Sequence, residues 1–179
     1  HTEVIANAVA RGAEEVNADA ALIKIGQDGT ISDNGWQLLD SADAIIFGAP
    51  TYMGAASGQF KMFADATAKP WFAQKWKDKL AGGFTVSGSY SGDKLAVLQQ
   101  FSILAAQHGM IWVSQGLLPA QPQADHVRGE DQINRLGSFL GVMGQAENKG
   151  ADVTPPSGDI KSAELYGARI ADAAKRWNK

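Results

Sequence analysis

The chain has 179 residues, a formal net charge of −3 and no cysteine. Without cysteine, disulfides, thiolate nucleophiles and cysteine-ligated metals are excluded. Lysine and arginine are scattered along the sequence, which argues against a nucleic-acid-binding surface. No apolar run reaches the length of a membrane span. We therefore expect one domain over residues 1–179, with no membrane insertion and, by elimination, a cytoplasmic location.

The N-terminal part of the chain predicts a helix, a strand and a second helix. Apolar residues recur at helical spacing directly after Thr2, which can cap the first helix. Residues 20–25 form a short apolar run typical of a strand. A short helix is expected around residues 36–41.

The stretch from Ala44 to Asp65 predicts a strand, a loop and a helix. The apolar run at residues 44–47 indicates a strand buried on both faces, which ends at Gly48. A turn follows over residues 49–54, and the sequence SGQF at residues 57–60 opens a helix. In open α/β sheets, ligands bind beyond the carboxyl ends of the strands. The loop is therefore a candidate binding loop, and an ordinary strand-to-helix turn is the alternative.

The side chains of this loop suit a flat ligand. Pro50 limits flexibility, Thr51 offers a hydroxyl, and Tyr52 and Met53 offer flat or soft apolar surface. Gly54 lets the backbone approach a ligand closely.

The remaining pattern predicts a parallel sheet with helices on both faces. Residues 80–86 indicate a strand, and the sequence SGSYSG follows it at residues 87–92. Asp93 is expected to cap a long helix, residues 110–113 to form the next strand, and Asp159 to cap a closing helix. Alternating strands and helices are typical of such a sheet.

The pattern dissolves between residues 116 and 158, where prolines and glycines accumulate. So long an excursion in a compact domain is usually functional or disordered. Its segment 133–143 is apolar enough to pack against the rest of the protein.

PTYMG at residues 50–54 and SGSYSG at residues 87–92 would meet at one edge of the sheet. With these loops the chain resembles the flavodoxin-like NAD(P)H:quinone oxidoreductases of the WrbA type, in the FMN-binding flavodoxin and NADPH-dependent FMN reductase superfamily. The resemblance covers nearly the whole length and is strongest over residues 48–65, at Trp71 and over residues 79–109. It implies a flavodoxin-like three-layer α/β/α sandwich with a parallel five-stranded sheet of order 2-1-3-4-5.

Members of this family begin with a strand and a phosphate-binding loop that ends in Gly-His-Thr or similar. This chain begins at His1-Thr2, where that loop would end. We therefore expect that the first strand and the true N-terminus precede the given sequence.

The resemblance also implies an FMN site that is built mainly from backbone. Thr2 and the backbone at His1 would belong to the phosphate cradle, although His1 could equally be a solvent-exposed residue without a role. Trp71 would approach the flavin from a neighbouring subunit, or else anchor a loop on its own core. Tyr90 and Ser91 stand where relatives often carry glycine. The residues so assigned to FMN are His1, Thr2, Pro50, Thr51, Tyr52, Met53, Gly54, Trp71, Ser87, Gly88, Ser89, Tyr90 and Gly92.

The implied activity is transfer of a hydride from NADH or NADPH to FMN and of two electrons to a quinone, with ping-pong kinetics. The flavin carries this chemistry, so no catalytic side chain and no metal is expected. His108 is expected to be a helix-terminus cation or a packed ring, and a substrate role for His126 in the excursion stays open.

The expected partners are a quinone, a nicotinamide and further copies of the chain in a homodimer or homotetramer. One alternative is a flavodoxin-type electron carrier, which binds FMN without reducing quinones. Such carriers tend to be strongly acidic, so a net charge of −3 favours the enzyme. Another alternative is a binding module without enzymatic activity, since fold alone does not settle function.

Overall fold

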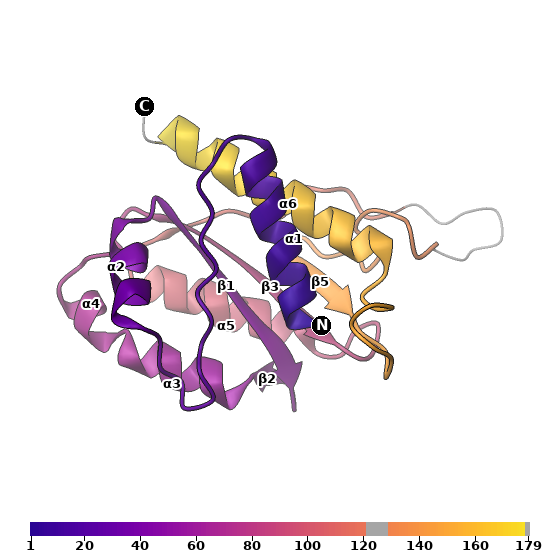
Figure 1. The fold of residues 1–179 in the computed structure, drawn as a ribbon, viewed down its shortest axis with the longest axis horizontal. Coiled ribbons are helices and arrows are strands. Elements are labelled where there is room, and N and C mark those ends of the chain that lie inside the picture. The colour runs from indigo at the N-terminus through magenta and orange to yellow at the C-terminus, as the bar shows by residue number, and fades with distance from the viewer. Residues whose placement is uncertain (121–128, 178–179) are drawn as a thin grey trace.

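A β-sheet between two helical layers forms the fold in the computed structural model, which describes residues 1–120 and 129–177 (Figure 1). The strands are β1 (Ala44–Tyr52), β2 (Ala55–Ala56), β3 (Leu80–Ser87), β4 (Ile111–Trp112) and β5 (Val142–Gln145). The helices are α1 (Thr2–Glu15), α2 (Asp33–Ser41), α3 (Gly58–Ala66), α4 (Ala68–Phe72), α5 (Lys94–Gln107) and α6 (Ser157–Trp177). Helices α1 and α6 pack on one face of the sheet, and α3 and α5 pack on the other. This arrangement confirms the predicted α/β/α class.

The sheet differs from the expected order in detail. β1 and β3 are parallel neighbours, paired from Ala44↔Leu80 to Pro50↔Val86. β4 pairs with the start of β3 and β5 with its end, both in parallel. β1 occupies one edge of β3. Strands β4 and β5 therefore lie one after the other along the opposite edge of β3. The excursion leaves the sheet after β4 and returns as β5, so it divides one outer strand position, and β2 is a short antiparallel addition to β1.

Two predicted strands need correction. Residues 20–25 form no strand, because no described strand lies beside them to complete a hydrogen-bond ladder, although Ile23 and Ile25 pack against the core. β1 does not end at Gly48 but continues to Tyr52, so most of the expected turn is strand. The excursion also contributes β5, which the sequence pattern did not indicate.

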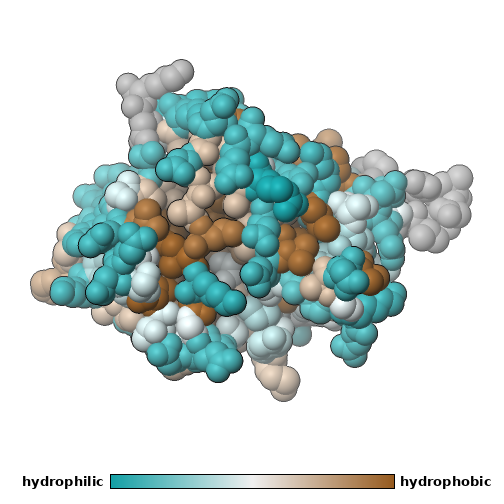
Figure 2. Space-filling model, in the orientation of Figure 1, coloured by the Kyte–Doolittle hydropathy of each residue, from teal (hydrophilic) through white to brown (hydrophobic). Residues whose placement is uncertain are grey.

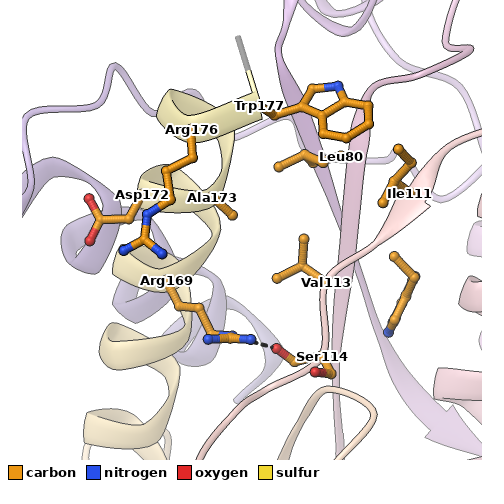
Figure 3. Close-up of a pocket in the computed structure, with 10 residues that line it drawn as sticks. Leu80, Ile111, Val113, Ser114, Arg169, Asp172, Ala173, Arg176 and Trp177 are labelled. Atoms are coloured by element: carbon orange, nitrogen blue, oxygen red, sulfur yellow. Dashed lines mark hydrogen bonds between the residues drawn. The ribbon is translucent and has the colours of Figure 1, made fainter. Parts of the chain in front are cut away.

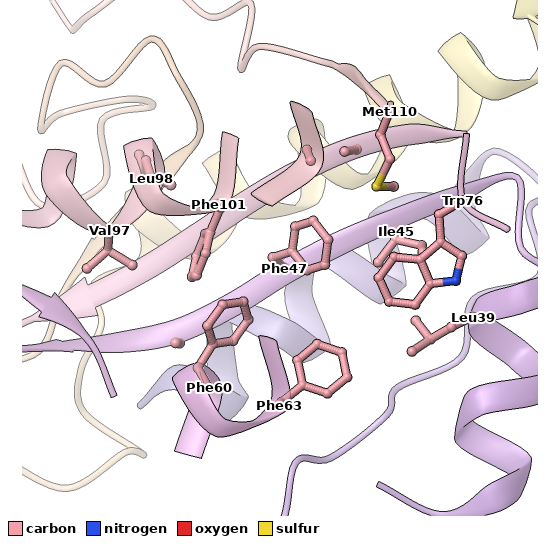
Figure 4. Packing of buried hydrophobic residues seen from close by; sticks show 13 residues of the cluster. Leu39, Ile45, Phe47, Phe60, Phe63, Trp76, Val97, Leu98, Phe101 and Met110 are labelled. Atoms are coloured by element: carbon pink, nitrogen blue, oxygen red, sulfur yellow. The ribbon is translucent and has the colours of Figure 1, made fainter. Parts of the chain in front are cut away.

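Aromatic side chains dominate the core between the sheet and α3 and α5 (Figure 4). The ring of Phe60 lies 4.5 Å from that of Phe101 and 6.1 Å from that of Phe47, between centroids. His108 stacks on the buried Trp76 at 4.4 Å, and its Nε2 lies 2.9 Å from Thr67 Oγ1. Burial lowers the pKa of His108. Of the two roles expected for His108, helix-terminus cation or packed ring, the structure therefore shows the packed ring.

Close helix packing forms the layer on the opposite face. A Cβ at Gly12 would lie 1.8 Å from the backbone oxygen of Glu164, so only glycine lets α1 and α6 cross here. These helices cover β3 and β5 more fully than β1. Side chains of β1 alternate between buried and half-buried, which corrects the expectation of burial on both faces. Figure 2 shows hydrophobic surface in the middle of this face.

Candidate functional site

The two predicted binding loops lie side by side at the carboxyl edge of the sheet. We call Pro50–Gly54 the first loop and Ser87–Gly92 the second loop. The register Pro50↔Val86 places the end of β1 next to the end of β3. Below them, the hydroxyls of Thr51 and Thr85 form a buried hydrogen bond of 2.7 Å. The sequence expectation that these loops meet is therefore confirmed.

The first loop is the tip of a β-hairpin. Thr51 pairs with Ala56, and Met53 and Gly54 make the turn with φ values of 50° and 78°. Positive φ at both central residues is typical of tight hairpins, but it is rare for a methionine and strains the backbone. The backbone N–H of Ala56 donates to Gln100 Oε1 at 3.0 Å, which fixes the hairpin to α5.

A buried lysine supports the second loop from below. Lys94 is the first residue of α5 and has 0% exposure. Its Nζ donates to Ser87 Oγ at 2.9 Å and to the carbonyl oxygen of Ser89 at 2.6 Å. Asp93 occupies the N-cap position of α5, as expected, but it has a left-handed conformation and its side chain makes no capping hydrogen bond.

A buried ion pair lies beside this lysine. Arg135 Nε and Nη2 donate to the two carboxylate oxygens of Asp159 at 2.8 and 2.9 Å. Both side chains are at most 3% exposed. Asp159 was expected to cap α6, but it lies within the first turn and binds Arg135 instead. Charged hydrogen bonds with this two-point geometry are among the strongest in proteins.

Gln145, at the end of β5, connects the ion pair to the second loop. Its side chain accepts from Arg135 Nη2 at 3.0 Å and donates to the carbonyl oxygen of Gly88 at 3.4 Å. The Arg135 guanidinium also lies 5.8 Å from the ring centre of Tyr90. We call Lys94, Arg135, Gln145 and Asp159 the ionic cluster. It contacts the second loop at its beginning and in its middle.

Burial shifts the pKa values of the charged groups in the ionic cluster. Burial, together with the charge of Arg135, lowers the pKa of Lys94 to about 8, against the opposing influence of Asp159. Burial raises the pKa of Asp159, against the influence of its hydrogen bonds to Arg135 and to the Gln145 N–H. These opposing effects follow because an interior of low polarity penalises any isolated charge.

The start of α1 reaches the same edge of the sheet. His1 Nε2 lies 2.8 Å from the carbonyl oxygen of Lys149, shortly after β5. Figure 1 shows the N-terminus beside the end of β5. The helix begins at Thr2 with His1 at the cap position, so the cap predicted at Thr2 is wrong. The free N–H groups of this helix end are available to an anion near the loops.

Trp71 lies at the opposite edge of the sheet. It belongs to α4, which precedes the amino end of β3, and its side chain is 45% exposed. It packs edge-on against Phe72, which is 85% exposed. Within one chain Trp71 therefore does not meet the two loops, and only another copy could bring it to them.

The surface of the two loops fits a flat ring with a polar margin. A Cβ added at Gly54 would meet no atom within 4 Å, and one at Gly88 would meet only a carbonyl oxygen at 3.6 Å. The backbone is thus open at both loops. Tyr52 and Tyr90 are 64% and 71% exposed beside it, and Met53 is fully exposed. Aromatic and soft side chains around accessible backbone amides suit the isoalloxazine of FMN.

A separate cavity of about 580 Å³ lies away from the loops, near the amino ends of β3 and β4 (Figure 3). Its walls include Trp177 and Arg169, whose Nε donates to the Ser114 carbonyl oxygen at 2.9 Å. Over residues 1–120 and 129–177, no group of three acidic or histidine side chains is placed to hold a metal. No helix in the same ranges could span a membrane. His126 lies outside the described residues.

A flavodoxin-like sheet with two open, aromatic-flanked loops at its carboxyl edge is typical of flavin-binding proteins. The NADPH-dependent FMN reductase family matches residues 1–124, and the chain belongs to this family. Flavodoxin FldP of Pseudomonas aeruginosa is 46% identical over 96% of this chain and 89% of its own length. An NAD(P)H dehydrogenase (quinone) of Archaeoglobus fulgidus is 32% identical over 77% of this chain, but the match covers only 62% of that protein.

Solved structures agree with this assignment. The flavodoxin, WrbA-like protein from Agrobacterium tumefaciens has a TM-score of 0.76 and 45% identity, over 98% of this chain and 90% of its own. The Trp repressor binding protein from Bacillus subtilis has a TM-score of 0.51 and 22% identity, over 100% of this chain and 92% of its own. This likeness supports the fold alone. The predicted WrbA-type family is confirmed, and with it FMN as cofactor and NAD(P)H as electron donor.

Proposed function

We propose that this protein is an FMN-dependent NAD(P)H:quinone oxidoreductase whose FMN lies between the first and second loops. The observation that carries the proposal is the convergence of two open, aromatic-flanked loops at one sheet edge. Relatives named NAD(P)H dehydrogenase (quinone) support the choice of a quinone as acceptor.

Backbone and helix ends would hold most of the cofactor. The N-terminus of α1, with Thr2 and the backbone of His1, would bind the phosphate, because helix N-termini attract anions. The ring and its polar chain would lie on the remaining residues of the two loops: Pro50, Thr51, Tyr52, Met53, Gly54, Ser87, Gly88, Ser89, Tyr90 and Gly92.

Bound FMN supplies the redox chemistry, as acceptor of a hydride from NAD(P)H and donor of two electrons to a quinone. The chain itself orients the ring and leaves one face accessible to each substrate in turn. Tyr52 and Met53, both strongly exposed, offer apolar surface to the nicotinamide or the quinone. The protons of quinone reduction come from solvent, so this proposal needs no acidic or basic side chain.

The proposal includes a homodimer or homotetramer in the cytoplasm, where NAD(P)H is regenerated. Trp71 and Phe72 expose adjacent aromatic rings. In an oligomer, Trp71 of one copy would cover the flavin of another. Light scattering gives the oligomeric state, and Trp71→Ala is expected to raise the KM for quinone more than it changes FMN binding.

The direct test is an absorbance spectrum after incubation with FMN and desalting. Retained flavin bands that NADH or NADPH bleaches anaerobically, and that benzoquinone restores, are the expected result. Initial rates at several quinone concentrations should then give parallel double-reciprocal lines. A folded protein that retains no flavin contradicts the proposal, and intersecting lines contradict the ping-pong order.

A flavodoxin-type electron carrier is the second candidate. The 46% identical relative named flavodoxin favours it. A carrier binds FMN and exchanges electrons with protein partners, so its bound flavin would not be bleached rapidly by NAD(P)H. Binding without bleaching would therefore select this function.

A further inference from the structure

Lys94 combines two features that destabilise a protein. Its ammonium group is fully buried, and it is the first residue of α5, at the positive end of the helix dipole. A buried cation is normally compensated by a carboxylate. Within the described ranges, no carboxylate lies within 4.0 Å of Lys94 Nζ, and the Coulombic influence of Asp159 is smaller than the burial penalty. A residue that violates two local preferences is expected where function requires it.

The partners of Lys94 are neutral oxygen atoms of the second loop. Nζ bonds the hydroxyl of Ser87, where β3 ends, and the carbonyl of Ser89, two residues further. The loop closes tightly over this contact: a Cβ at Gly92 would lie 2.0 Å from Ser87 Oγ. Lys94 therefore fixes the conformation of the loop between its first residues and the start of α5.

We propose that Lys94 is a positioning residue of the FMN site, which holds the second loop in its ring-binding conformation and favours reduced FMN through its buried positive charge. The inference depends on the proposed function, specifically on FMN binding at the second loop. It adds a residue that stands outside the set assigned to the site from the sequence.

The physical basis is electrostatic. Two-electron reduction increases the negative charge of a bound flavin, and a fixed cation nearby lowers the free energy of that state. The effect is larger in a protein interior than in water, because the interior screens charge less. A residue that only filled space would affect oxidised and reduced FMN equally.

Three substitutions separate the two parts of the proposal. Lys94→Met keeps the approximate volume and removes both charge and donors. Lys94→Gln keeps a hydrogen-bond donor without charge, and Lys94→Arg keeps both. Lys61→Met is the matched control, because Lys61 lies on α3 with 70% side-chain exposure and pairs with Asp65.

The measurements are urea unfolding of each variant and its dissociation constants for oxidised and anaerobically reduced FMN. We expect Lys94→Met to weaken the binding of oxidised FMN by roughly tenfold, as for a lost charged hydrogen bond. The binding of reduced FMN should weaken by a further factor of about ten. Lys94→Gln should recover part of the affinity for oxidised FMN but not the preference for the reduced form. Lys94→Arg should recover both, and Lys61→Met should match the wild type.

Equal affinities of wild type, Lys94→Met and Lys94→Gln for both forms would overturn the proposal, and so would a loss of stability without a change in binding. If Lys94→Met does not fold, the contrast between Lys94→Gln and Lys94→Arg decides. If the wild type binds FMN and the Lys94 variants bind it equally well, this inference alone is rejected. A folded wild type that binds no FMN rejects it together with the proposed function.

Discussion

The two loops at the carboxyl edge are neighbours, but they are held in different ways. The first loop is the tip of a hairpin, secured by backbone pairing and by neutral contacts at Thr51 and Gln100. The second loop rests on the ionic cluster, whose members come from α5, the excursion, β5 and α6. The first loop is thus held by hairpin pairing and neutral hydrogen bonds, and the second by charged groups that only the complete fold brings together. Substitutions and changes of pH should therefore affect the stability of the two loops differently.

The largest effect is expected from Asp159→Ala, which removes the carboxylate from a buried ion pair. Arg135 would be left as a buried cation, and the free energy of unfolding should fall by about 3–5 kcal/mol. Urea unfolding measures this change. Asp65→Ala, in the exposed pair with Lys61, is the control and should cost less than about 0.5 kcal/mol. Similar losses in the two variants would contradict a special role for the ionic cluster.

The pH dependence of stability should come from the second loop. Burial lowers the pKa of Lys94 from 10.5 to about 8. Between these values the unfolded chain binds a proton that the folded chain has released, so stability rises with pH in this window. Wild type should therefore gain stability relative to Lys94→Met between about pH 8 and 10.5 in urea unfolding. A constant difference would show that Lys94 titrates normally.

The first loop should respond to the loss of a neutral contact. Thr51→Val leaves the buried Thr85 hydroxyl without its partner, which costs about 1–3 kcal/mol at any pH. Thr51→Ser keeps the hydroxyl and should retain most of the stability. A Thr51→Val variant as stable as wild type would mean that the hairpin does not need this contact.

The smallest expected effect on stability is a gain, from a substitution at Met53 in the first loop. Met53 has a φ of 50° and is fully exposed, so Met53→Gly relieves strain without loss of packing. We expect a gain of up to about 1 kcal/mol in unfolding free energy, together with weaker FMN binding because apolar surface is lost. Thermal and urea unfolding test the first effect, and a fluorescence titration tests the second. A destabilised variant would contradict the assigned strain.

Features that depend on neighbouring residues could be predicted from the sequence. A strand, a turn and a helix lie within residues 44–66 as predicted, although β1 is longer than expected and β2 precedes the helix. The buried Phe60 and Phe63 lie on one helix face as expected. β3 and α5 also lie where the pattern placed them. The position of the two loops followed from the rule that parallel strands end at the same sheet edge.

Features that depend on distant partners could not be predicted. β5 is short and glycine-containing, and it forms only because β3 offers a free edge. Asp159 carries the signature of a helix cap, and its real partner, Arg135, lies in the excursion. Lys94 resembles an ordinary charged residue of a first helical turn. Its burial becomes visible only when the second loop closes over it.

A crystal structure of the FMN complex would show whether FMN binds between the first and second loops. We expect the ring between Tyr52 and the backbone of Gly88, with the phosphate at the start of α1. A ring in the cavity between β4 and α6, beside Arg169 and Trp177, would contradict this expectation.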